Sequence, residues 1–400
     1  MAARLSPLDL LEQRPTRAEV FLDAVDANLA AVWARVGDLP ILGVVKANAY
    51  GHGAVPVARA LAGAGIDSLG VAMLEEAKEL RRAGVTTPLL MMGALEPEQM
   101  DAVILEGVTP ALFREDQATA LDLSASRHGR PHPFHLKIDT GMGRLGVPWR
   151  RVDGFLDVLS RCPRLILEGV FSHLACADDP DHPLTQTQID RFEEVLDRVR
   201  SRGFSPRYCH LSNSAALLDR PPTWMNLVRP GLILYGYRPS LRNRSIPLRP
   251  VLRFVTRVVF LKEVAVGDAV GYGATFRAKR TSRIATVAAG YDDGVIRSLS
   301  NRGHFLVRGR RVPIAGRVSM DLTTLDVTDF PEVALGDEAV LVGGQGEEFQ
   351  GADRVAAEGD TISWEILCGI GCRVPRVYLR GGRIVEVLSR FQVQGGGGAR

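Results

Sequence analysis

The sequence lacks the features that mark membrane, secreted and nucleic-acid-binding proteins. No run of about 18 apolar residues occurs, and Met1 to Arg14 has no apolar core of signal-peptide length. The 49 Lys and Arg residues nearly balance the 46 Asp and Glu residues, and no basic stripe suggests a nucleic-acid partner. The composition therefore predicts a cytoplasmic globular protein with neither a membrane nor a nucleic-acid partner.

Cysteine and clustered metal ligands are also scarce. The five cysteines are odd in number and scattered, which predicts reduced and mostly buried thiols. Cys368 and Cys372 are too isolated to bind a metal on their own, and His132 and His135 lack partners at ligand spacing. We expect no metal site.

The sequence does have a regular alternation of strand-like and helical stretches. The clearest helical stretches are 54–61, 75–83, 152–159 and 186–200, and Asp23 is a candidate N-cap for an earlier helix. Apolar runs typical of β-strands begin near Ile41, Ser68, Pro88, Thr109, Pro133, Leu167, Arg207 and Asn226. Eight strands in βαβ order predict an α/β fold, a closed (β/α)8 TIM barrel.

The pattern changes after Tyr237. Residues 240–250 are basic, contain proline and predict a linker. Beyond them, short strand-like runs at 251–261, 283–289, 304–307, 338–342 and 384–388 are separated by turn signals, with one helix at 363–368. We predict a barrel domain over 1–243, of which 1–23 can pack with a mostly β domain over 244–390, and a disordered glycine-rich tail over 391–400.

One lysine of the barrel half stands at an unusual place. Ile41 to Val45 is almost entirely apolar, as interior parallel strands are, and Lys46 closes this run. A desolvated amine there is a nucleophile that can form a Schiff base with a carbonyl. A lysine that snorkels to water is the alternative, and the stretch 44–53 does not decide between the two.

Polar residues also stand at the carboxyl ends of four further predicted strands, where barrel active sites are assembled. These strand ends carry Lys137 with Asp139 and Arg144, Ser172-His173, Ser212-Asn213-Ser214, and Arg229-Pro230-Gly231. Each group alone has an ordinary structural explanation. Five strand ends on one face together predict an active site.

The last two of these strand ends form a corner where barrels commonly bind phosphate. Asn213-Ser214 opens a short helix whose first N–H groups and hydroxyl can hold an anion, and Gly231 exposes a backbone N–H. A ligand with an aldehyde for Lys46 and a phosphate for this corner would be pyridoxal 5'-phosphate.

A competing motif is G-x-G-x-x-G at residues 141–146, which can signal a dinucleotide-binding fold. That fingerprint belongs in the first βα turn of its unit and leads directly into a helix. Here it follows the fifth strand and precedes Pro148 and Trp149. We therefore do not predict a Rossmann oxidoreductase.

With these residues in view, the chain resembles the alanine racemase family from about Pro15 to Leu388. The resemblance rests on motifs in the family's order at 44–53, 137–146, 172–173, 212–214, 229–231, 271–276, 290–294, 316–321 and 373–376. It implies a pyridoxal-phosphate barrel with a C-terminal β domain, working as a head-to-tail homodimer. It also implies interconversion of L-alanine and D-alanine, supplying D-alanine for peptidoglycan.

The resemblance assigns roles to individual residues. Lys46 and the partner subunit's Tyr272 match the two catalytic bases, one on each face of the substrate, and Arg144 with His173 would give the tyrosine a cationic neighbourhood. Arg229 matches the partner of the pyridine nitrogen, which it should keep unprotonated, and Lys137 a lysine that can be carbamylated to pair with Arg144. Cofactor-binding positions are Lys46, Tyr50, Arg144, His173, Asn213, Ser214, Arg229, Gly231, Leu232 and Trp364; substrate-binding positions are Arg144, Tyr291 and Met320.

One departure keeps the substrate range open. Trp364 stands where most relatives have a tyrosine, and an indole offers only one N–H donor in a different place, so a serine or broader-specificity racemase stays an alternative. A non-catalytic pyridoxal-phosphate carrier would lack the second domain that holds Tyr272 and Met320. A decarboxylase of the same design would place a carboxylate, not Arg229, against the pyridine nitrogen.

Overall fold

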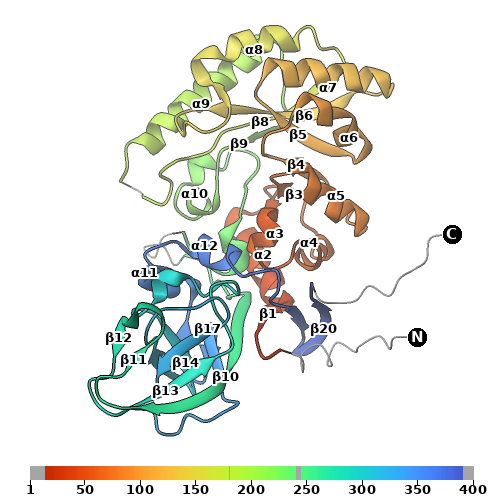
Figure 1. Cartoon of the computed structure of the whole chain (residues 1–400). Helices are drawn as coiled ribbons and strands as arrows, with labels where there is room; N and C mark the ends of the chain where they lie inside the picture. Colours follow the sequence, from red (N-terminus) through yellow and green to blue (C-terminus); the bar gives the residue numbers. More distant parts are fainter. Residues whose placement is uncertain (1–13, 180, 240–244, 391–400) are drawn as a thin grey trace, which may run out of the picture. The chain divides into compact units, whose positions relative to one another are not determined.

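The structure is a computed structural model that describes residues 14–179, 181–239 and 245–390 (Figure 1). The chain forms two compact units, one of Val25–Ala49 with Ala54–Arg249 and one of the N-terminal segment to Ala24 with Tyr50–Gly53 and the chain from Pro250. The predicted tail and residues 240–244 of the predicted linker lie outside the described residues.

The first unit contains a parallel sheet whose strands follow one another in the order of the sequence (Figure 1). The ring is closed by residues 226–230, although they form only an isolated bridge, Ile41 to Val228. Leu42 N–H donates to the Val228 carbonyl at 2.9 Å, and Arg229 N–H donates to the Ser212 carbonyl at 3.2 Å. The strands are β2 (Leu42–Val44), β3 (Ser68–Val71), β4 (Leu89–Met91), β5 (Val108–Leu112), β6 (His132–Asp139), β8 (Leu165–Phe171) and β9 (Tyr208–His210), with β7 (Val147–Pro148) beside β6.

Helices follow the strands and cover the outside of the sheet (Figure 1). Each helix packs against the sheet through apolar side chains on one of its faces. Val57 and Leu61 of α4, for example, are fully buried. The helices are α2 (Leu22–Val36), α4 (Ala54–Gly63), α5 (Leu74–Arg82), α6 (Met100–Leu105), α7 (Glu115–Arg127), α8 (Val152–Leu159), α9 (Leu184–Ser201) and α10 (Ser214–Asp219). This alternation confirms the predicted (β/α)8 barrel.

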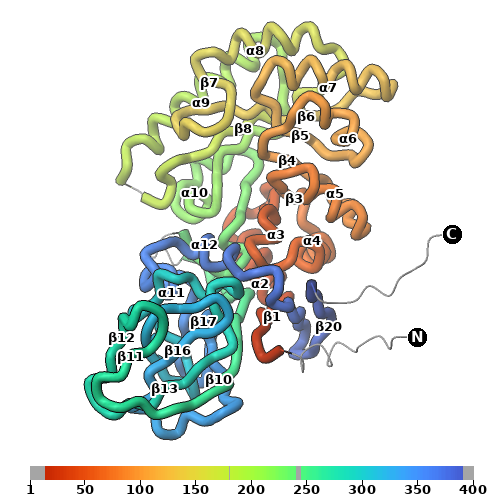
Figure 2. Tube along the Cα trace, in the orientation of Figure 1, coloured from red at the N-terminus to blue at the C-terminus, as the bar shows by residue number. Residues whose placement is uncertain are grey.

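The second unit is built on an extended, mostly antiparallel sheet. Figure 2 shows the path of the chain through β10, β13 and β17 of this sheet. The N-terminal strand β1 (Arg17–Phe21) belongs to it, paired with β10 on one side and β19 on the other. Its other strands are β10 (Leu252–Val264), β13 (Ser282–Val287), β14 (His304–Val307), β15 (Arg310–Pro313), β16 (Thr323–Asp326), β17 (Glu338–Gln345), β18 (Glu348–Gln350), β19 (Arg376–Arg380) and β20 (Arg383–Leu388); β11 (Ala269–Val270) and β12 (Phe276–Arg277) form a separate pair.

Two predictions about helices are wrong. Asp23 lies inside α2 and is not its N-cap, because the helix starts at Leu22 and the Asp23 carboxylate instead accepts the Gly381 N–H at 2.7 Å. Among its described residues the second unit has two α-helices where one was expected, α11 (Ala352–Gly359) beside α12 (Ser363–Cys368). Short, glycine-ended α11 buries Val355 and Ala356, a pattern too brief to stand out in the sequence.

No helix in the described ranges is long and apolar enough to cross a membrane. Within those same ranges, no group of three or more His, Cys, Asp and Glu side chains could hold a metal ion.

The chain leaves β2 through a turn of left-handed backbone. Four residues in succession, Ala47 to Tyr50, have φ of 52 to 53°, although none is glycine. Each such residue costs about 1–2 kcal/mol for an L-amino acid, so local bonds must hold the turn. Within the barrel unit, Ala49 N–H donates to the Val45 carbonyl at 2.9 Å, and the Asn48 side-chain oxygen accepts the Ala54 N–H at the start of α4 at 2.7 Å.

We expect Asn48→Ala to destabilise the protein by about 1–2 kcal/mol, because it removes this cap and replaces a residue that tolerates positive φ. Urea-induced unfolding measures the loss. Asn48→Asp keeps both the acceptor and the tolerance and should stay close to the wild type, whereas Asn48→Gly keeps only the backbone freedom and should fall between. Equal losses for Asp and Ala would show that the cap does not hold the turn.

Candidate active site

The structure brings five of the predicted site residues together at the carboxyl ends of the barrel strands. Lys46 follows β2, Lys137 lies in β6, Arg144 follows it, His173 follows β8 and Arg229 lies in the closing segment. Burial, followed by the charges of Arg144, Arg229 and Lys46, lowers the pKa of Lys137 to about 8. The same cations act on His173, so all five lie within electrostatic reach of one another.

His173 carries no charge at neutral pH. Burial, then Arg229, Arg144, Lys137 and Lys46, lower the pKa of its imidazole to about 3. The expectation that His173 helps to supply a cationic neighbourhood is therefore wrong, because a proton on its ring would be surrounded by like charges. Positive charge at this end of the barrel comes from lysine and arginine.

Arg229 is the most enclosed of these cations, with 4% of its surface exposed. Its Nη2 donates to the backbone carbonyls of Ser172 at 2.8 Å and Leu211 at 3.2 Å, and its Nη1 lies 3.1 Å from His210 Nδ1. Burial lowers its pKa to about 9, so the guanidinium stays protonated at pH 7. In the described part of the chain, no carboxylate forms an ion pair with it.

Lys137 is buried beside the same phenylalanine as Arg229. Its Nζ donates to the Met92 carbonyl at 3.0 Å and lies 5.6 Å from the centre of the Phe171 ring, while the Arg229 guanidinium lies 5.5 Å from that centre. With its pKa near 8, Lys137 has a neutral fraction far larger than that of an ordinary lysine.

The predicted anion corner is present in a smaller form than expected. The Ser214 hydroxyl oxygen accepts the Gly231 N–H at 2.9 Å, and Leu232 opens the 3-10 helix η4 (Leu232–Tyr235) beside it. Asn213 is the N-cap of α10, and its side chain accepts N–H groups of that helix at 3.0 and 3.1 Å. Those N–H groups and the Gly231 N–H are therefore occupied, and the expectation that they bind an anion is wrong.

The G-x-G-x-x-G loop wraps an aspartate. The Asp139 carboxylate accepts the N–H groups of Gly141 at 2.9 Å and Gly143 at 3.0 and 3.1 Å, and the loop continues into β7 and the 3-10 helix η2 (Trp149–Arg151). Because the loop leads into a strand and a 3-10 helix instead of directly into an α-helix, and the sheet is a closed barrel, a dinucleotide-binding fold is excluded.

Tyr50 and its two glycines are enclosed by the second unit's own residues. Burial, then Cys368, raises the pKa of the Tyr50 hydroxyl, which keeps its proton as a donor. A Cβ at Gly51 would collide with the Leu367 carbonyl, and one at Gly53 with the Tyr378 hydroxyl. The two glycines therefore accommodate protein atoms.

Three more of the predicted residues are exposed in the second unit, and Tyr272 is the first residue of the 3-10 helix η5 (Tyr272–Ala274). The side chains of Tyr272, Met320 and Tyr291 are 72%, 52% and 42% exposed, which is unusual for large apolar and aromatic groups. Tyr291 N–H donates to the Ser319 carbonyl at 2.9 Å, which holds the Tyr291 and Met320 loops together. Trp364 is half-buried in α12.

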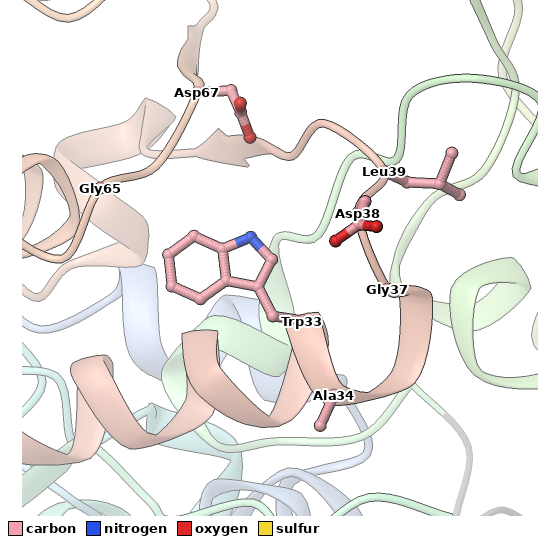
Figure 3. A pocket seen from close by; sticks show the side chains of 7 residues that line it. All are labelled: Trp33, Ala34, Gly37, Asp38, Leu39, Gly65 and Asp67. Carbon is pink, nitrogen blue, oxygen red and sulfur yellow. The ribbon is translucent and has the colours of Figure 1, made fainter.

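A surface hollow of the barrel unit lies away from these residues. It is lined by the end of α2, the loop that enters β2 and the loop before β3, including Trp33, Asp38 and Asp67 (Figure 3). These segments precede the strands, whereas the basic residues follow them. The hollow is therefore at the opposite end of the barrel from the candidate site.

Sequence reasoning missed the polar residues that support the site. Gln188 of α9 donates to the His173 carbonyl at 2.9 Å and to Thr140 at 3.2 Å, and Thr140 bonds the Ser172 hydroxyl at 2.8 Å. His210 contacts Arg229 from the neighbouring strand. The period-2 alternation of strands could have revealed His210, because it lies two residues before Ser212 on the same face.

Comparisons with known proteins agree over both units. The family profile described as alanine racemase, N-terminal domain, matches residues 20–239, and that described as alanine racemase, C-terminal domain, matches residues 251–378. The chain is 44% identical over 368 residues to an alanine racemase of Halothermothrix orenii, covering 91% of this chain and 97% of the relative. It is 45% identical over 377 residues to one of Sorangium cellulosum, covering 91% and 99%.

Solved structures give the same result. The crystal structure of an alanine racemase from Bacillus anthracis with bound L-Ala-P superposes with a TM-score of 0.88 at 38% identity, covering 94% of this chain and 98% of that one. An alanine racemase from a Streptomyces lavendulae that produces D-cycloserine gives 0.87 at 36% identity, covering 92% and 98%. By the profile matches and by identity over nearly its whole length, the chain belongs to the alanine racemase family.

Proposed function

We propose that this protein interconverts L-alanine and D-alanine with pyridoxal 5'-phosphate as its cofactor. The observation that carries the proposal is the basic group at the carboxyl ends of the barrel strands, in a chain of this family. Lys46, Lys137, Arg144 and Arg229 are four basic side chains within electrostatic reach of one site. Such a site favours an anionic ligand.

The residues present fit this cofactor. Lys46 offers an amine for its aldehyde, and the Ser214 hydroxyl with the start of η4 forms a corner for its phosphate. The buried Arg229 offers N–H donors to a ring nitrogen, and the exposed Arg144 offers a charge to the ring's phenolate oxygen. Asn213 would act indirectly, by fixing the start of α10 that carries Ser214.

When bound, pyridoxal phosphate supplies an electron sink for the electron pair that the departing α-proton leaves behind. Inversion of the α-carbon then needs one proton carrier on each of its faces. Lys46 would take or give the proton on one face. Tyr272 does so on the other face, where its exposed hydroxyl is supplied by the partner subunit.

Arg229 would determine the charge on the ring nitrogen of the cofactor. A guanidinium has only N–H donors and stays protonated at pH 7, so Arg229 donates a hydrogen bond to the ring nitrogen without giving up its proton. The ring nitrogen then gains no full charge, which favours return of the proton to the α-carbon over other outcomes.

We also propose a homodimer with composite active sites. Tyr272, Tyr291 and Met320 are 42 to 72% exposed in the single chain, although they match catalytic and substrate-binding positions. Exposed aromatic and methionine side chains are typical of residues that a partner covers. Supply of D-alanine to peptidoglycan and a cytoplasmic location stay predictions from the resemblance and the composition.

We expect the protein, loaded with pyridoxal phosphate, to racemise L-alanine faster than any other amino acid, and Tyr272→Phe to lower this rate by about 10²- to 10⁴-fold, the usual contribution of a positioned acid or base. Chiral chromatography of a panel of L-amino acids measures both. Because the phenyl ring keeps its shape, the variant should retain the visible absorbance of the bound cofactor, which Lys46→Ala should lose.

The matched control is Tyr208→Phe, which removes a tyrosine hydroxyl outside the proposed site and should leave the rate unchanged. Faster racemisation of serine would move the assignment to the alternative that Trp364 keeps open. Release of carbon dioxide, or cofactor absorbance without any racemisation, would refute the proposed activity.

The composite dimer predicts that two inactive variants restore each other. In a mixed dimer of Lys46→Ala and Tyr272→Phe, one site combines an intact Lys46 with an intact Tyr272, while the other site lacks both. Random reassociation of equal amounts should therefore recover about a quarter of the wild-type activity. If Tyr272 served its own chain, mixing would recover nothing.

Lys137 should form a carbamate with carbon dioxide. The ammonium first loses one proton; the neutral amine then attacks the carbon, forms an N–C bond as one C–O π bond opens, and releases a second proton, so that a cation becomes an anion that can pair with Arg144. Because the pKa of Lys137 is about 8, the carbamate signal in ¹³C NMR with labelled bicarbonate should grow as pH rises toward 8. Lys137→Gln should abolish the signal and Lys279→Gln, at an exposed lysine, should keep it. A wild-type spectrum without this signal would contradict the prediction.

A further inference from the structure

The barrel interior contains a chain of polar contacts that leads from Arg229 away from the proposed cofactor site. Arg229 Nη1 lies 3.1 Å from His210 Nδ1, His210 Nε2 lies 2.8 Å from His135 Nδ1, and His135 Nε2 lies 3.4 Å from Glu168 Oε2. The three residues after Arg229 come from β9, β6 and β8. Both imidazoles are buried, whereas the Glu168 side chain is 30% exposed.

We infer that Glu168 is a positioning residue that fixes Arg229 through the two buried histidines. The two ends of this chain of contacts determine the direction in which its hydrogen bonds are donated. The Arg229 guanidinium can only donate hydrogen bonds, and the Glu168 carboxylate can only accept them. Three hydrogen bonds join these ends through two imidazoles. Each neutral imidazole has one donor and one acceptor nitrogen.

Only one arrangement of protons satisfies all three contacts. Arg229 donates to His210 Nδ1, His210 donates from Nε2 to His135 Nδ1, and His135 donates from Nε2 to Glu168. Both histidines must be neutral with the proton on Nε2. A proton on Nδ1 of His210 would face the Arg229 N–H groups and push the guanidinium away.

The packing keeps the two rings in these orientations. Phe171 stacks on His210 with ring centres 4.8 Å apart and planes 11° apart. His135 lies over Gly169, where a Cβ would come within 2.6 Å of the ring. Burial lowers the pKa of both histidines, and the hydrogen bond from His135 lowers the pKa of Glu168. The charges that face the histidines are Arg229 on one side and Glu168 on the other, and Arg207 and His132 lie near Glu168.

Loss of the Glu168 carboxylate removes the acceptor that fixes the direction of these hydrogen bonds. Without Glu168 the two imidazoles can exchange tautomers, and the Nδ1–H form of His210 opposes Arg229. Insofar as Arg229 faces the ring nitrogen of the cofactor, which rests on the proposed function, the exchange also changes the surroundings of that nitrogen. The arrangement of histidine protons itself does not depend on the cofactor.

The test compares Glu168→Gln, whose amide oxygen can still accept, with Glu168→Leu, which cannot. Histidine side chains labelled with ¹⁵N report by NMR which ring nitrogen carries the proton in the full-length protein loaded with pyridoxal phosphate. We expect Nε2–H signals for both His135 and His210 in the wild type and in Glu168→Gln, and mixed tautomers in Glu168→Leu. Glu193→Leu, at an exposed glutamate of α9, is the matched control and should resemble the wild type.

Two further readouts separate positioning from a merely structural role. In Glu168→Leu the absorbance of the bound cofactor should shift, and kcat should fall on the order of tenfold with little change in KM, as for residues that orient a ligand-contacting side chain. Glu168→Gln should restore both. A wild-type His210 that carries its proton on Nδ1, or on both ring nitrogens, would overturn the inference even if Glu168→Leu did not fold. A Glu168→Leu variant that folds and keeps the wild-type tautomers and kcat would also overturn it. Absence of racemisation in a wild type with the expected tautomers would refute only the proposed function.

Discussion

The burial of a positive charge inside the barrel is the constraint on which the site depends. Arg229 is taken out of water without an ion-pairing carboxylate in the described part of the chain, and an uncompensated buried charge costs several kcal/mol. Two backbone carbonyls, a histidine acceptor and the face of Phe171 compensate part of this cost. The proposed cofactor, an anionic ligand with a ring nitrogen, would add a further partner for this guanidinium.

The strained turn after Lys46 holds this lysine close to the other basic side chains of the site. The left-handed residues after Lys46 reverse the chain within one turn, and Asn48 then caps the helix that returns along the sheet. Such strain persists only where surrounding contacts over-determine the conformation. The amine therefore stands on a short, fixed connection between two regular elements, close to the cations that lower the pKa of Lys137.

The sequence predicted those parts of the structure that depend on local periodicity, and failed where tertiary contacts decide. All eight barrel strands and the lysine at the end of the first could be predicted, because apolar runs and strand ends are visible in one dimension. The occupied N–H groups after Asn213, the neutral His173 and the packing of Gly51 against Leu367 could not, since each depends on residues distant in sequence. The eighth strand was found by its pattern although it forms only one isolated bridge.

The geometry of a parallel barrel also explains why a second domain belongs to this chemistry. All strands of the barrel end on the same side, so the side chains that follow them approach a bound ligand from one direction. Lys46, Lys137, Arg144 and Arg229 all obey this rule. Inversion of a carbon centre requires proton transfer on two opposite faces, and strand ends that meet a ligand from one side supply only the first. In the proposed mechanism the second base therefore comes from outside the barrel, and the candidate is Tyr272, an exposed tyrosine of the second unit that Gly271 and Gly273, both at positive φ, flank.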